Sequence, residues 1–136
     1  MRHWLALAAG IIGGAAIVLF ATRRVLDVVE VQGGSMAPSL LPGDRLLVEA
    51  LTYRWRAPRA GEVVLAIDPR APGRELIKRV RASGPEVDLR GDAPAASTDS
   101  RAFGTIAVTE VRWRAMLRYW PLSRFGLLPA GPYRAG

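Results

Sequence analysis

The sequence predicts a compact, mostly β domain carried on a single N-terminal transmembrane helix. Two observations lead to this fold class. Residues 4–21 contain no charged side chain, which is typical of a membrane-spanning helix. Beyond residue 24 the chain changes to short apolar runs that are separated by glycine and proline, and no stretch there keeps a convincing 3.6-residue period.

The apolar stretch WLALAAGIIGGAAIVLFA (4–21) is long enough to cross a bilayer. Eighteen helical residues span about 27 Å, close to the hydrocarbon thickness of about 30 Å. Arg23 and Arg24 follow at once and suit the membrane interface. A cleaved signal peptide with Arg2 as its basic start is the alternative, but no small-x-small cleavage pattern follows. We expect a retained anchor over residues 1–24, and charges at both of its ends leave its orientation open.

Six later stretches have the composition of β-strands: 25–32, 45–51, 62–68, 75–82, 86–91 and 109–120. The last alternates cleanly, with Val111, Trp113, Ala115, Leu117 and Tyr119 on one face and three arginines on the other. Turn-forming residues separate the strands at 33–34, 42–44, 68–73 and 91–100. We therefore predict one β domain over residues 25–128 and a C-terminal tail at 129–136.

The composition excludes several kinds of active site. The 136 residues include no cysteine and a single histidine, His3. Disulfides, thiolate metal sites, Ser-His-Asp triads and H-E-x-x-H zinc sites are therefore absent. We expect no metal and no other cofactor, and the base of any catalytic reaction must be a carboxylate or a lysine.

The net charge of +7 raises the possibility of nucleic-acid binding. From residue 25 onward, however, the chain has 16 basic and 12 acidic residues, and the arginines are scattered without a helical basic stripe. A solvated face near anionic lipid explains this charge equally well. We expect a lipid bilayer, and no nucleic acid, among the partners.

Lys78 is the only lysine in a chain with eighteen arginines. In a strand, Leu76, Lys78 and Val80 share one face, while Arg79 and Arg81 take the other. Burial lowers the pKa of an amine and can make it a general base, which arginine cannot become. A lysine whose stem packs while its head reaches water is the alternative, and the pattern alone does not decide between the two.

A candidate nucleophile is Ser35, in the stretch VQGGSMAPSLLPGD (31–44). Gly33 and Gly34 would allow a substrate backbone to approach closely, and we expect Met36 and Pro38 to give the loop an apolar, substrate-binding rim. The string also resembles the nucleophile elbow of an α/β-hydrolase, but that fold needs a catalytic histidine and alternating helices. An ordinary turn serine is the remaining alternative.

Together, four stretches resemble the successive conserved boxes of signal peptidase I, a family of Ser/Lys membrane proteases. They are SMAPSLLPGD (35–44), GEVVLAID (61–68), LIKRVRASG (76–84) and GDAPAASTDSRAFG (91–104). The likeness covers roughly residues 27–121. YWPLSRFG (119–126) is similar to the C-terminal part of short members, including the mitochondrial inner-membrane peptidases.

This resemblance implies a role for each matching residue. Ser35 is expected to be the nucleophile, and its backbone N–H is expected to donate to the oxyanion. Lys78 is expected to be the general base and Ser97 to hydrogen-bond the lysine. Asp99 and Arg101 match the pair that braces the site.

Two departures leave details open. Gly33 replaces a serine whose hydroxyl is a second oxyanion donor in some relatives. Ala93 stands where the box that begins with Gly91 and Asp92 usually continues with asparagine. The large extra β domain of long signal peptidases is also missing.

The resemblance predicts a membrane-bound serine endopeptidase that removes signal or pro-peptides from precursor proteins through an acyl-enzyme. It further implies a catalytic domain on the extracytoplasmic side. Self-cleaving SOS repressors share the Ser/Lys dyad, but they carry a DNA-binding domain where this chain has an apolar helix. A membrane-anchored β binding module is the non-enzymatic alternative. The client stays open between general secretion and a dedicated precursor, because proteases that mature nickel-type superoxide dismutase have a box similar to 91–104.

Overall fold

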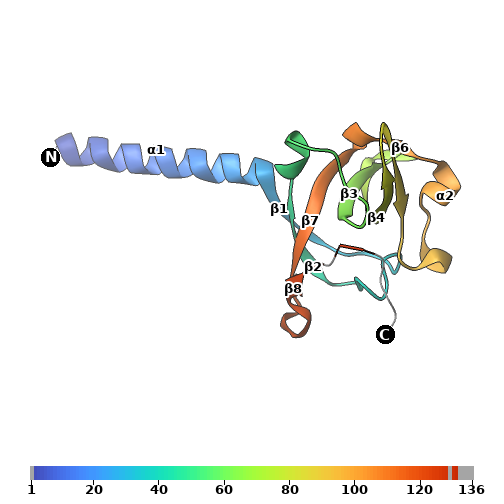
Figure 1. The fold of residues 1–136 in the computed structure, drawn as a ribbon. Helices are drawn as coiled ribbons and strands as arrows, with labels where there is room; N and C mark the ends of the chain where they lie inside the picture. The colour runs from blue at the N-terminus through green and yellow to red at the C-terminus, as the bar shows by residue number, and fades with distance from the viewer. Residues whose placement is uncertain (1, 129, 132–136) are drawn as a thin grey trace.

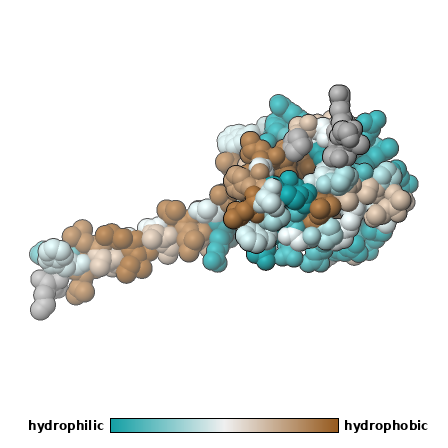
Figure 2. Space-filling model, turned by 90° about the horizontal axis from the view of Figure 1, so that it is seen from below, coloured by the Kyte–Doolittle hydropathy of each residue, from teal (hydrophilic) through white to brown (hydrophobic). Residues whose placement is uncertain are grey.

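A long N-terminal helix, α1 (Arg2–Val25), projects from a β domain (Figure 1). The computed structural model describes residues 2–128, 130 and 131. Residues 3–23 of α1 are apolar enough to cross a membrane, and all of them are exposed; 21 residues correspond to about 32 Å. Figure 2 shows hydrophobic surface along α1 and on the part of the domain that borders it. The predicted apolar helix is thus confirmed.

The β domain is one antiparallel sheet of eight strands. The strands are β1 (Leu26–Glu30), β2 (Arg45–Glu49), β3 (Val63–Asp68), β4 (Ala71–Ser83), β5 (Glu86–Arg90), β6 (Ile106–Ala107), β7 (Val111–Trp120) and β8 (Gly126–Leu127). Their order is β1-β2-β7-β3-β4-β5-β6, and β8 pairs with β7. All six predicted strands are present and the mostly β fold class is confirmed; β6 and β8, with two residues each, had no recognisable signal.

Five short helical turns connect the strands. They are α2 (Ser100–Phe103) and the 3-10 turns η1 (Thr52–Arg54), η2 (Pro94–Ala96), η3 (Val108–Glu110) and η4 (Leu122–Arg124). The predicted tail at 129–136, except for residues 130 and 131, lies outside the described residues.

Strand β3 lies at the centre of the core because both of its faces are buried. Val63 and Leu65 belong to one hydrophobic cluster, together with Val31, Met36, Leu40, Leu46, Val48 and Ala115. Val64 and Ala66 belong to a second cluster, together with Val80, Val87, Leu89, Ile106 and Val111. Four consecutive buried apolar residues are typical of a strand that is covered on both sides.

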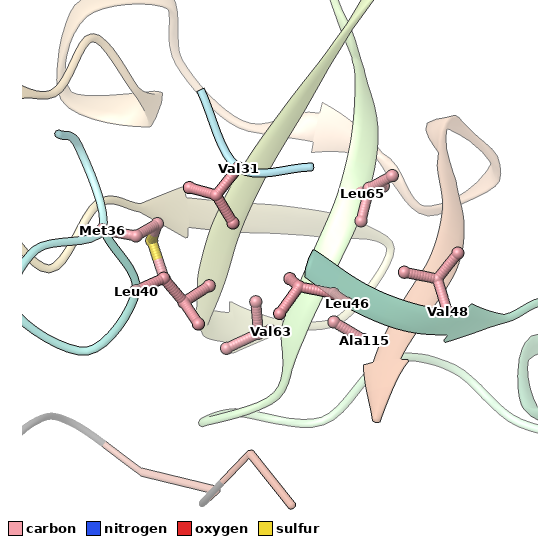
Figure 3. Packing of buried hydrophobic residues seen from close by; sticks show 8 residues of the cluster. All are labelled: Val31, Met36, Leu40, Leu46, Val48, Val63, Leu65 and Ala115. Carbon is pink, nitrogen blue, oxygen red and sulfur yellow. The ribbon is translucent and has the colours of Figure 1, made fainter. Parts of the chain in front are cut away.

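The loop that carries Ser35 is closed by hydrogen bonds at its ends and is held to the core by two of its side chains. Val31 N–H donates to Asp44 C=O across 2.8 Å, and Gly43 N–H donates to Val31 C=O across 2.9 Å. Met36 and Leu40 extend from the loop into the first cluster beside Val31 (Figure 3). Met36 is only 1% exposed, so the expected apolar rim is wrong for this residue: its side chain fills the core instead.

The buried carboxylate of Asp44 connects this loop to the C-terminal part of the domain. Arg124 donates to Asp44 across 2.8 Å, and Arg118 donates to the carbonyl of Ser39 across 2.9 Å. Leu41 N–H and Arg118 also donate to the Asp44 carboxylate, at 2.9 and 3.4 Å. The segment similar to the C-terminal part of short peptidases therefore holds the serine loop in place.

Along β4 the predicted inward face is largely correct. Leu76, Lys78 and Val80 are buried, whereas Arg81 is exposed. Arg79, which we expected on the wet face, is also buried, because it forms a two-bond ion pair with Asp92 at 2.8 and 2.7 Å. The local alternation could not reveal this partner, since it lies thirteen residues further along the chain.

Candidate active site

The loop after β1 and the first half of β4 enclose a cleft of about 610 Å³. Ser35 lines it from the loop and Lys78 lines it from the strand, so the fold brings the two candidate catalytic residues to one cavity. Gly33, Gly34 and Met36 line the same cleft. Pro38 is exposed and is not among the lining residues.

The side chain of Lys78 is held by a polar chain that leads into the protein. Lys78 Nζ donates to Ser97 Oγ across 3.0 Å, and Ser97 Oγ donates to Asp99 Oδ2 across 2.7 Å. Lys78 is 3% exposed and Asp99 is 1% exposed. The amine is therefore fixed in a largely dehydrated place by a neutral hydroxyl, with the carboxylate one step behind.

Asp99 organises the segment around it. It caps α2 by accepting the backbone N–H of Arg101, and it also accepts the Arg101 guanidinium and the N–H of Gly91. Burial alone would raise the pKa of Asp99, but the hydrogen bonds from Arg101, Gly91 and Ser97 outweigh it and hold the pKa well below its usual range. These hydrogen bonds therefore hold Asp99 in its charged form.

Electrostatics favour the neutral form of Lys78. Burial lowers the pKa of the amine below its ordinary value, since the ammonium loses hydration. The charge of Asp99 opposes this shift, while the positive charges of Arg70, Arg101 and Arg74 add to it. A free amine is thus available at a lower pH than for a lysine in water.

Gly91 allows two parts of the site to come together. A Cβ atom at this position would lie 2.2 Å from Ser97 Oγ and 2.5 Å from the carbonyl oxygen of Ser35. The Ser35 carbonyl also accepts the N–H of Ala93 across 3.0 Å. The main chain at Ala93 therefore holds the serine loop, although the asparagine side chain of related boxes is absent.

The backbone at Ser35 leaves a donor free for a ligand. Within residues 2–128, the N–H of Ser35 has no hydrogen-bond partner. Gly33 has a φ of 74°, a left-handed conformation that glycine adopts without strain. The turn thus presents an unpaired N–H beside the serine hydroxyl.

Three further charged residues near the cleft were not predicted from the sequence. Asp68 is 1% exposed and accepts two bonds from the Arg70 guanidinium and one from the Arg70 backbone N–H, all 2.9 Å, with Arg74 at 3.7 Å. We read 68–73 only as a turn, because the pairing depends on how β3 and β4 meet. Arg70 and Arg74, which contact Asp68, both line the cleft.

Within the described residues, no three acidic or histidine side chains gather as a metal site. The cleft does bring together a serine hydroxyl, from Ser35, and a buried amine, from Lys78.

Comparisons with known proteins identify the family to which this chain belongs. A family model described as "Signal peptidase, peptidase S26" matches residues 1–92. Mitochondrial ATP-independent inner membrane protease subunit 1a of Arabidopsis thaliana is 34% identical, over 78% of this chain and 77% of the relative. Mitochondrial inner membrane protease subunit 1 of Homo sapiens is 32% identical, over 82% and 80%. The probable signal peptidase I-2 of Synechocystis is 26% identical, over 92% and 77%. The chain belongs to the signal peptidase family and is a membrane serine endopeptidase that processes precursor proteins.

Proposed function

We propose that Ser35 is the nucleophile and Lys78 the general base of this peptidase. The observation that carries the proposal is the buried Lys78, which shares a cleft with Ser35 and whose amine is held by Ser97. A serine hydroxyl is a weak nucleophile until an adjacent base removes its proton. Within this cleft a neutral lysine is suited to do so, because burial lowers its pKa.

The reaction would proceed in two halves. In the first, Lys78 takes the proton of Ser35 while the Ser35 oxygen attacks the scissile carbonyl; the amine of the leaving fragment then receives that proton and departs. In the second, Lys78 activates a water molecule that hydrolyses the ester on Ser35 and restores the enzyme. Ser97 and Asp99 would act behind Lys78 as positioning residues, and Arg101 would secure Asp99.

The free N–H of Ser35 is the proposed oxyanion donor. Such donors stabilise the negative charge of the tetrahedral intermediate and often supply a large share of the rate enhancement. With Gly33 two residues earlier, no side chain there can be a second donor. We infer that a backbone donor or water takes that place.

The substrate would bind as an extended strand along β4. Between Glu75 and Lys78, β4 pairs with β3 on one side only, since its pairing with β5 begins at Arg79. A peptide can add to such an open edge through main-chain hydrogen bonds. Gly33 and Gly34 would form the facing wall, and the buried Met36 would form the floor under a small side chain.

The client can be identified by direct digestion. The detergent-solubilised protein would be incubated with secretory precursors and with a nickel-type superoxide dismutase precursor, whose proteases have a box similar to 91–104. Mass spectrometry would map the new N-terminus. Cleavage at one defined position, lost in Ser35→Ala, is the expected result; equal cleavage by Ser35→Ala would show that another protease is responsible.

For the topology, we propose a single pass with the β domain on the extracytoplasmic side, as the family implies. The support is that α1 is the one helix among the described residues long and apolar enough to cross a bilayer. In spheroplasts, added protease should digest the β domain without detergent. If the domain is digested only after detergent is added, the β domain lies on the cytoplasmic side instead.

A further inference from the structure

A second surface, at the end of the β domain that joins α1, is built from η1 and the start of β7. A hollow of about 490 Å³ is lined by residues 50 and 53–58 on one side and by residues between 108 and 112 on the other. It lies apart from the proposed catalytic cleft, because the two share no lining residue.

The backbone places this surface at the end of α1. Ala50 N–H donates to the carbonyl of Val25, the last residue of α1, across 2.9 Å, and Leu26 pairs with Glu49. The η1 turn follows two residues later and lies beside the domain end of α1 (Figure 1). If α1 spans the bilayer as proposed, η1 lies at the membrane surface.

The side chains of this surface combine exposed apolar area with uncompensated positive charge. Trp55 is 83% exposed and Leu51 is 47% exposed. Arg54 and Arg112 are exposed, and within the described part of the chain neither guanidinium has a partner. By contrast, the guanidinium of Arg56 is paired with Glu62.

We propose that this surface docks the β domain onto anionic phospholipid headgroups. Guanidinium groups bind phosphate oxygens in a fixed fork geometry. Tryptophan favours the headgroup region, because there its apolar ring can contact lipid while its N–H forms a hydrogen bond with water or a headgroup. Arg54 and Arg112 would bind the phosphates across the hollow while Trp55 inserts beside them. Together with α1 they give the domain a second attachment to the bilayer, which fixes its tilt independently of the cleavage chemistry.

A spin label can test this contact, because the chain has no cysteine of its own. The full-length Ala57→Cys variant places a nitroxide beside Trp55 on the rim of the hollow. Ala102→Cys, on exposed α2 at the far end of the domain, is the control (Figure 1). Both are reconstituted into vesicles of phosphatidylcholine, with or without phosphatidylglycerol. Electron paramagnetic resonance then compares how often the nitroxide collides with oxygen, which dissolves in lipid, and with a nickel complex, which stays in water.

With phosphatidylglycerol, the label at Ala57 should gain exposure to oxygen and lose exposure to nickel, while the label at Ala102 stays in water. Removing Arg54 or Arg112 by alanine should lower the ratio of docked to free domains about fivefold each. The matched variant Arg81→Ala, an exposed arginine elsewhere on the domain, should have no effect.

Three results would overturn the proposal. One is equal exposure to nickel, in anionic vesicles, of the labels at Ala57 and at Ala102. Another is shielding at Ala57 that is equal in phosphatidylcholine and in detergent, which would indicate a protein neighbour. The third is an equal effect of Arg81→Ala. Flotation of the vesicles shows separately whether α1 has inserted.

Discussion

Lys78 Nζ lies 3.0 Å from Ser97 Oγ, and this hydroxyl in turn donates to the buried carboxylate of Asp99. The lysine therefore does not pair directly with the acid. A direct ion pair would favour the ammonium, whereas an intervening hydroxyl fixes the amine and keeps the stabilising charge at a distance. This arrangement is suited to a lysine that must lose its proton to work.

Ser97→Ala should lower kcat by roughly 5- to 150-fold, because an unpaired buried group costs about 1–3 kcal/mol and 1.36 kcal/mol is tenfold in rate. The acid limb of the pH profile should also move, since Lys78 loses its link to Asp99. KM should change little. The exposed Ser123→Ala is the matched control. Wild-type kcat with an unchanged pH profile in Ser97→Ala would remove Ser97 from the mechanism and leave the proposed dyad standing.

Gly91→Ala should inactivate the enzyme, although the change adds one methyl group. The new Cβ would lie 2.2 Å from Ser97 Oγ and 2.5 Å from the Ser35 carbonyl, so the serine loop or Ser97 must move. Gly84→Ala is the matched control, because nothing lies within 4 Å of its Cβ position. Turnover and thermal unfolding should be measured together. Full activity in Gly91→Ala would mean that the two segments need not approach so closely.

Asp92→Ala should destabilise the fold by about 3–5 kcal/mol, because it leaves the buried guanidinium of Arg79 without its carboxylate. The more exposed pair Arg90–Asp88 provides the comparison. Asp88→Ala should cost about 0–1 kcal/mol. Urea unfolding measures both free energies. Equal losses for the two variants would contradict the structural role given to the Arg79–Asp92 pair.

Peptidase activity should rise with pH. The active form of Lys78 is the neutral amine, which is protonated and inactive at low pH. Burial lowers the pKa of Lys78, so the midpoint of the rise should fall below the ordinary value for lysine. Arg74→Ala removes a positive charge that contributes to this lowering, so the midpoint should move to higher pH. Arg81→Ala is the control. A shift to lower pH in Arg74→Ala would contradict the electrostatic account.

The sequence predicted the architecture because the signals of the helix and of the longer strands are local. An uncharged stretch ending at Arg23 and Arg24 predicts the helix, and period-two patterns predict the longer strands. The inward position of Lys78 follows from the same period. Ser35 and Ser97 came from resemblance to a family, since a serine in a turn carries little information by itself.

Features that depend on distant partners could not be predicted in this way. Arg79 is buried because Asp92 meets it across the fold. Met36 packs into the first hydrophobic cluster, and a loop has no fixed period from which its inward side could be inferred. The requirement for glycine at position 91 arises where Ser97 and the Ser35 carbonyl converge, and only the three-dimensional structure shows that approach.

The most direct test of the proposed dyad is the turnover of a cleavable precursor by wild type, Lys78→Arg and Ser35→Ala at neutral pH. Arginine keeps the positive charge and much of the length of lysine, but it does not deprotonate in the working range. We predict that both variants lose cleavage while their circular dichroism and thermal unfolding show a folded domain. Substantial cleavage by folded Lys78→Arg would contradict the account, because a permanently protonated side chain cannot activate Ser35.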